Sequence, residues 1–195
     1  MLSKDDAERC LGPYLPTIKT CIDGGWAAWK QHYAAREHVL DARARASIVY
    51  CETLALAKAA FDGAEGVRFV KKRGLSLSYI GEVALRFKKL KRNGTCSNVP
   101  TQQQRCLQMQ IEIPGFLPST YVNAGYVLDP LQQEIERVLV SCQLADKVIW
   151  SIRPGQDGRG TSGGLVTRLP VAPALRPARR VRPRKDKQVK DGETS

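Results

Sequence analysis

The chain has 195 residues, of which 43% are hydrophobic and 26% charged, and its formal net charge is +12. This length suits one compact domain with appendages, and the composition is that of an ordinary globular protein, which argues against wholesale disorder. The positive charge favours a polyanionic partner, with nucleic acid first and an anionic membrane surface second.

The first 25 residues predict two short helices. Acidic residues after Ser3 are typical of a helix start, and Gly12 and Pro13 interrupt the pattern. A second turn or helix is expected to follow and to end at Gly24 and Gly25, since paired glycines are common at helix ends.

Residues 26–61 give the strongest helical pattern of the chain. They contain no proline or glycine and are rich in alanine, arginine, glutamate and leucine. The segment exceeds the usual length of a globular helix, so we expect either one long helix or two helices that break near residues 38–42. His32 and His38, six positions apart, would lie on different faces and cannot form a helical metal pair.

Three strands are predicted over residues 67–70, 75–80 and 83–87, because apolar and polar residues alternate there. In the third of these strands, Arg86 and Lys88 fall on the face opposite its apolar residues. We therefore expect both cations to project together from the outer face of a sheet.

The segment that follows allows two interpretations. Asn93 and Gly94 predict a turn, and Thr101 is a suitable N-cap for a short helix that reaches toward Gln110. The alternation over residues 107–113 would also suit a strand. We favour a helix that gives way to extended chain near Gln110.

Three further strands are predicted over residues 121–128, 135–143 and 147–152. Their short connections favour antiparallel neighbours. Together the patterns predict an α+β fold, in which a mainly antiparallel sheet of five to six strands packs against one long N-terminal helix or two shorter ones.

Beyond Arg153 glycine, proline and arginine dominate. Such a sequence cannot bury enough apolar surface to fold alone. We expect a single α+β domain over residues 1–153 and a disordered basic tail over residues 154–195. The N-terminus lacks an apolar signal segment and no apolar run approaches the roughly 20 residues that span a bilayer, so the expected location is cytoplasmic, with no membrane span.

The positive charge is concentrated in two blocks. Residues 67–92 hold nine Lys or Arg against one acidic residue, and residues 151–195 hold eleven against four. The favoured hypothesis is therefore non-specific nucleic-acid binding through a basic sheet face and the basic tail. The candidate binding residues are Arg86, Lys88, Lys89, Lys91 and Arg92 in the domain and Arg179, Arg180, Arg182, Arg184 and Lys185 in the tail.

Two other functions stay open. A metal-dependent nuclease would need carboxylates near a lysine, and Glu82, Lys88, Asp129, Glu134 and Glu136 could converge across neighbouring strands. A subunit or neutralising partner of another protein would need exposed anchors, and the tryptophans are the natural candidates.

The sequence carries no phosphate-binding loop, dinucleotide fingerprint, zinc-protease motif or nucleophile elbow, and its six cysteines are scattered. These features favour a binding protein without cofactor or metal over an enzyme. The basic runs also have a plain alternative, since charged turns keep a sheet edge from aggregating. The motif-like segments SNVPTQQQ (97–104) and NAGYVLDP (123–130) receive no role from the sequence alone.

Overall fold

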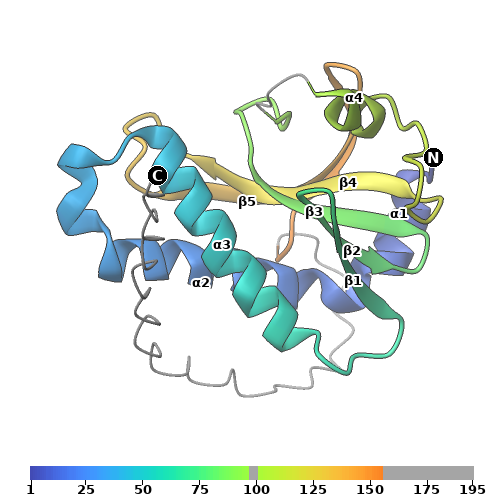
Figure 1. Cartoon of the computed structure of the whole chain (residues 1–195), viewed down its shortest axis with the longest axis horizontal. Helices are drawn as coiled ribbons and strands as arrows, with labels where there is room; N and C mark the ends of the chain where they lie inside the picture. Colours follow the sequence, from blue (N-terminus) through green and yellow to red (C-terminus); the bar gives the residue numbers. More distant parts are fainter. Residues whose placement is uncertain (97–100, 156–195) are drawn as a thin grey trace, which may run out of the picture. The chain divides into compact units, whose positions relative to one another are not determined.

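The structure is a computed structural model that describes residues 1–96 and 101–155. Within these residues, helices lie on both faces of one six-stranded sheet (Figure 1). The elements run in the order α1 (Lys4–Leu11), η1 (Gly12–Tyr14), α2 (Leu15–His32), η2 (Ala34–Val39), α3 (Ala42–Ala60), β1 (Val67–Lys72), β2 (Leu75–Ile80), β3 (Val83–Lys89), α4 (Gln102–Gln108), β4 (Thr120–Leu128), β5 (Ile135–Leu144) and β6 (Lys147–Ile152), where η marks a 3₁₀-helix.

The second helix does not end at Gly24 and Gly25, as the sequence suggested. Instead α2 continues to His32, because α3 packs directly on this stretch. A Cβ atom at Gly25 would lie 2.1 Å from the Thr53 hydroxyl, and one at Gly24 would lie 2.7 Å from a methyl group of Leu56. The two glycines are thus a contact surface between helices, and tertiary packing outweighs their weak helix propensity.

The predicted long helix is two helices. The chain breaks at η2 and at Leu40, and Asp41 then caps α3, its side chain accepting a hydrogen bond from the Ala44 amide at 2.6 Å. The buried residues of α3, namely Arg45, Val49, Thr53 and Ala57, recur every fourth position. This narrow stripe is the face that meets α2 and the sheet.

The six strands lie in sequence order across the sheet. Every neighbouring pair is antiparallel except β3 and β4, which are parallel. The parallel pair requires a crossover, and residues 90–119, with α4, supply it. The predicted α+β fold with a mainly antiparallel sheet is confirmed.

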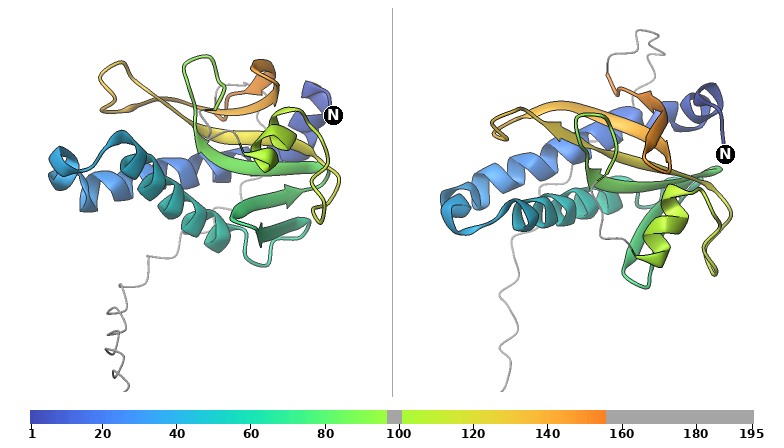
Figure 2. Two further views of the ribbon diagram at one scale, coloured as in Figure 1. Left: turned by 45° about the horizontal axis from the view of Figure 1, so that its top comes forward. Right: turned by 90° about the horizontal axis from the view of Figure 1, so that it is seen from above.

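The sheet is covered on both faces. On one face, α2 and α3 lie side by side and enclose the main core, whose fully buried members include Ile18, Ile22, Val49, Leu85 and Val122 (Figure 2). Each such side chain contributes about 1.5–3 kcal/mol by leaving water. On the other face, α4 and the loop after it cover a smaller cluster that includes Leu77, Leu107 and Tyr121.

The helix predicted after Thr101 is confirmed, and the strand alternative for residues 107–113 is wrong. The Thr101 side chain accepts a hydrogen bond from the Gln104 amide at 3.2 Å. The side-chain amide of Gln110 then holds the segment after α4 against two strands. Its nitrogen donates to the carbonyl oxygens of Tyr121 and Gln143, each at 2.9 Å. Its oxygen accepts a hydrogen bond from the main-chain amide of Tyr121 at 2.9 Å. These bonds hold α4 over β4 and β5.

The sheet opens into a fork between β2 and β3. These strands pair only through Ser78, Tyr79 and Ile80 on the β2 side. Toward the other end of the hairpin, β1 and β2 turn away from β3 (Figure 2). The divergence leaves the second half of β3 without a sheet neighbour on that side, and the candidate site forms there.

Of the expected tail, only Pro154 and Gly155 fall within the described residues. Its basic residues, Arg179, Arg180, Arg182, Arg184 and Lys185, lie outside them. Among the described helices, none combines the length and apolarity that crossing a bilayer requires.

Candidate nucleic-acid interface

A cleft of about 790 Å³ lies in the fork, between α3, the turn of the β1–β2 hairpin and the second half of β3. Its volume is within the range of known ligand pockets. Its lining residues are Ala42, Arg43, Ala46, Ser47 and Tyr50 from α3, Gly74, Leu75 and Ser76 from the hairpin, and Arg86, Lys88, Lys89, Leu90 and Lys91 from β3 and the residues after it.

Five of the lining residues are cationic: Arg43, Arg86, Lys88, Lys89 and Lys91. None of the described residues that line the cleft is acidic. Charges of one sign gathered in a concave site focus the field and raise the local concentration of counter-ions. The cleft is therefore an anion-attracting site.

Four of these cations come from one short segment, residues 86–91, because the second half of β3 runs along the fork. Alternation along the strand places Lys88 on the same face as Arg86, and Lys89 on the face of α2 and α3. Past Leu85, the edge of β3 that would meet β2 lies at the cleft instead. Side chains from both faces of the strand thus contribute cations to one opening.

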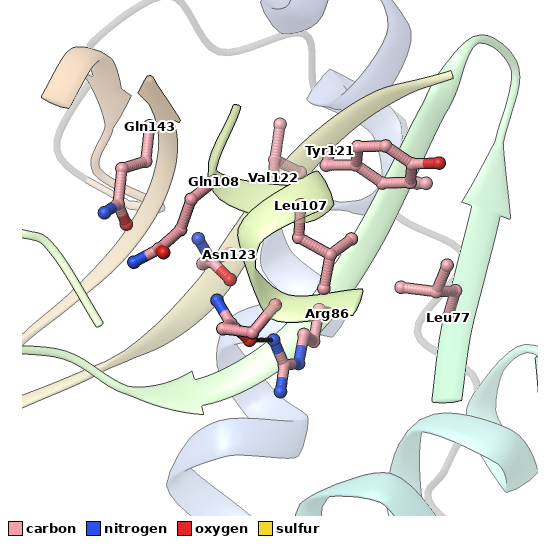
Figure 3. A pocket seen from close by; sticks show the side chains of 10 residues that line it. Leu77, Arg86, Leu107, Gln108, Tyr121, Val122, Asn123 and Gln143 are labelled. Atoms are coloured by element: carbon pink, nitrogen blue, oxygen red, sulfur yellow. Dashed lines mark hydrogen bonds between the residues drawn. The ribbon is translucent and has the colours of Figure 1, made fainter. Parts of the chain in front are cut away.

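Arg86 is half-buried rather than fully outward-facing, which corrects the sequence prediction. Its face of the sheet is covered by α4, and its Nη1 donates a hydrogen bond to Oε1 of the buried Gln104 (Figure 3). Burial lowers the pKa of Arg86. An arginine remains charged even so, which leaves a half-buried positive charge at the inner wall of the cleft.

Lys88 and Lys89 are also half-buried. Burial lowers the pKa of Lys88, and the neighbouring Arg86 lowers it further. Burial likewise lowers the pKa of Lys89, with Arg45 as the second cause. The partly buried site disfavours the charged forms of both lysines, and a bound anion would reduce this free-energy cost.

Lys89 is anchored by the turn between β4 and β5. Its Nζ donates to Oε1 of Gln132 at 3.1 Å, and the same oxygen accepts from Nη2 of Arg45 at 2.9 Å. Arg45 also pairs with Glu37 at 2.7 Å. This network fixes Lys89 at the side of the cleft nearest α3.

Arg92 does not line the cleft, although the sequence groups it with the other four cations. Its Nη2 pairs with Oε2 of Glu136 at 3.2 Å, on the side of β5. The tight turn between Leu90 and Cys96, in which the amide of Lys91 bonds the carbonyl of Thr95, carries Arg92 to that side.

Sequence reasoning missed the contribution of α3. Arg43, Ser47 and Tyr50 are spaced four and three positions apart, so they share one helical face, and all three line the cleft. That spacing was the available signal. The spacing identifies these residues as part of the cleft only together with the position of α3 beside β3.

A smaller cavity adjoins the cleft and shares Ala46, Tyr50, Lys88 and Lys89 with it. Tyr126 also lines this cavity, and its buried hydroxyl has no hydrogen-bond partner among the described residues. Burial raises the pKa of Tyr126, so the hydroxyl is neutral.

None of the carboxylates of the nuclease hypothesis lines the cleft beside Lys88. Glu82 begins the turn into β3, about 20 Å along the strand from Lys88. Asp129 accepts hydrogen bonds from the main-chain amides of residues 133 and 134. Glu134 forms an ion pair with Lys30, and Glu136 forms ion pairs with Arg92 and Arg137. In residues 1–96 and 101–155 there is no group of three or more His, Cys, Asp or Glu side chains able to hold a metal ion.

The tryptophans proposed as anchors for a protein partner are buried. Trp26, Trp29 and Trp150 are each at most 7% exposed. Trp26 packs against Tyr126, and Nε1 of Trp150 donates to the carbonyl of Leu2 at 3.1 Å. All three belong to the main core and not to a surface that a partner could reach.

Comparison of the chain with models of protein families, with curated proteins and with solved structures gave no match.

Proposed function

We propose that this protein binds nucleic acid through the cleft, mainly by contacts to phosphates and with little sequence preference. The observation that carries the proposal is the set of five cations, contributed by α3 and by the end of β3, around one opening whose described lining holds no acid. Lys and Arg on such a surface neutralise phosphates and release counter-ions.

The burial of the cations adds support. Solvated lysines on a sheet edge keep their ordinary pKa, whereas Lys88 and Lys89 have lowered pKa values because they are partly removed from water. Keeping these charged side chains partly removed from water lowers the stability of the free protein. A polyanion bound in the cleft would offset that cost.

The test is the binding of a labelled 20-nucleotide strand of mixed sequence to the full-length protein, measured by fluorescence anisotropy over a series of salt concentrations. Each lost phosphate contact should reduce the slope of log K against log salt by about 0.7 for a single strand. The double variant Lys88→Ala/Lys91→Ala should bind about tenfold more weakly and with a slope smaller by about 1.4.

The matched control is Lys58→Ala/Lys147→Ala, which removes the same charge from exposed positions outside the cleft. Lys58 lies on α3, about 22 Å along the helix from Arg43. This control should retain nearly all of the affinity. Equal losses in the two double variants would show that net charge alone drives binding and would overturn the proposal.

A further inference from the structure

We propose, on the basis of the nucleic-acid binding suggested above, that the cleft accepts a single strand with one base unpaired and inserted between β2 and β3. A double helix would then be excluded from the cleft. Three features of the fork carry this inference.

The first feature is the shape of the opening. At its closed end, the last residues of β2 and β3 that pair are Ser78 and Leu85. Paired strands lie about 4.8 Å apart, so the fork widens from roughly that spacing. A wedge of this kind admits a flat base or a single backbone, whereas the stacked core of a duplex cannot enter it.

The second feature is a supply of hydrogen-bonding groups on the main chain. β3 pairs with β4 over its whole length but with β2 only at residues 83–85. Glu82 and Leu90 bond β4, so the main-chain groups of the alternate residues Phe87 and Lys89 point to the side that β2 leaves open, and Lys89 lines the cleft. Such groups can bond the Watson–Crick edge of a base, which is free only in an unpaired strand.

The third feature is an aromatic ring among apolar walls. Tyr50 is half-buried and lines both the cleft and the smaller cavity beside it, while Leu75 and Leu90 line the cleft on the strand side. A base can stack on the ring of Tyr50, where it would leave water and contact the two leucines. Arg43 and Lys91 are more exposed than Arg86 and Lys88, so they lie where the phosphates of an inserted nucleotide would emerge.

These features separate base insertion from simple attraction to phosphates. A duplex presents phosphates more densely than a single strand, so a purely electrostatic surface, including any basic tail, favours the duplex. A preference for the single strand needs contacts to bases.

The experiment compares a labelled 20-nucleotide single strand with the blunt duplex of the same sequence, using the full-length protein at one salt concentration. The protein should bind the single strand at least tenfold more tightly. Tyr50→Leu, which keeps apolar packing against the core but removes the ring, should lose about fivefold or more in single-strand affinity. Tyr50→Phe should retain it, and neither variant should change duplex binding.

Three outcomes would overturn the inference while leaving phosphate binding intact: equal or tighter binding of the duplex, equal affinities of Tyr50→Leu and Tyr50→Phe, or competition by a mononucleotide as strong as by the strand, which would indicate a free-nucleotide site. The proposed function fails separately. In that case neither nucleic acid binds at low salt, or Lys88→Ala/Lys91→Ala has no effect on either.

Discussion

The main chain of Gly125 on β4 lies directly against the carbonyl group of Lys88 on β3. A Cβ atom at Gly125 would stand 1.8 Å from that oxygen and 2.9 Å from the carbonyl carbon. The two residues are partners in the parallel ladder, and a backbone group cannot move aside as a flexible side chain can. Glycine at position 125 is thus a condition for the course of β3 along the cleft.

Gly125→Ala should therefore destabilise the protein by about 1–3 kcal/mol or more through overpacking, and should weaken nucleic-acid binding because Lys88 is displaced. Urea denaturation and the anisotropy assay would measure the two effects. Asn123→Ala, two positions earlier on the same face of β4, is the comparison and should leave stability within about 1 kcal/mol. Wild-type stability of Gly125→Ala would contradict the close approach.

Gly25 in α2 offers a second test of close packing. Gly25→Ala should cost about 1–3 kcal/mol, because its Cβ would meet both the hydroxyl and the main-chain nitrogen of Thr53. At Gly12 nothing lies within 4 Å of a Cβ, and its φ of −45° is helical. Gly12→Ala should thus be neutral or slightly stabilising. Thermal unfolding of both variants checks the contrast, which would be absent if α2 and α3 did not pack here.

Lys88 should show a conflict between stability and binding. Its pKa in the folded protein is below the ordinary value of 10.5, so the unfolded chain holds the proton more tightly. Between the two pKa values the stability of the free protein rises with pH, and below them the full cost of the charge is present. Lys88→Met should therefore stabilise the protein at neutral pH by about 0.5–2 kcal/mol and weaken nucleic-acid binding.

The measurement is the free energy of unfolding of wild type and Lys88→Met from pH 7 to above pH 10.5. The advantage of the variant should shrink as the pH approaches the ordinary lysine pKa, because the wild-type side chain is then neutral in both states. Lys58→Met, at an exposed position on α3, should show no such pH-dependent gain. A stabilisation that does not change with pH would point to packing and not to charge.

Gln104 holds Arg86 at the inner wall of the cleft by accepting a hydrogen bond from its guanidinium group. Gln104→Glu places a carboxylate where the amide oxygen now accepts, which should stabilise the free protein but compete with phosphate for the guanidinium. We expect affinity for a single strand to fall about three- to tenfold. Gln102→Glu adds the same charge at an exposed position on α4 and should lower affinity much less. Equal effects of the two substitutions would place Arg86 outside the binding surface.

The sequence by itself determined the local elements. Apolar alternation and turn residues located all six strands to within two residues at either end, because both are local features of the chain. The same alternation put Arg86 and Lys88 on one face of β3. The Thr101 cap and the turn at Asn93 and Gly94 were also readable, since both depend on neighbouring residues.

Only the tertiary structure decided how these elements meet. The parallel pairing of β3 with β4, the passage of α2 through Gly24 and Gly25, and the divergence of β2 from β3 depend on contacts between residues far apart in the chain. The fork brings Arg43 close to three cations of β3 and to Lys91, which follows the strand. The turn after Leu90 carries Arg92 away from them, to Glu136. Charge is a property of the sequence, but its collection in one cleft is decided by long-range packing, which no local pattern encodes.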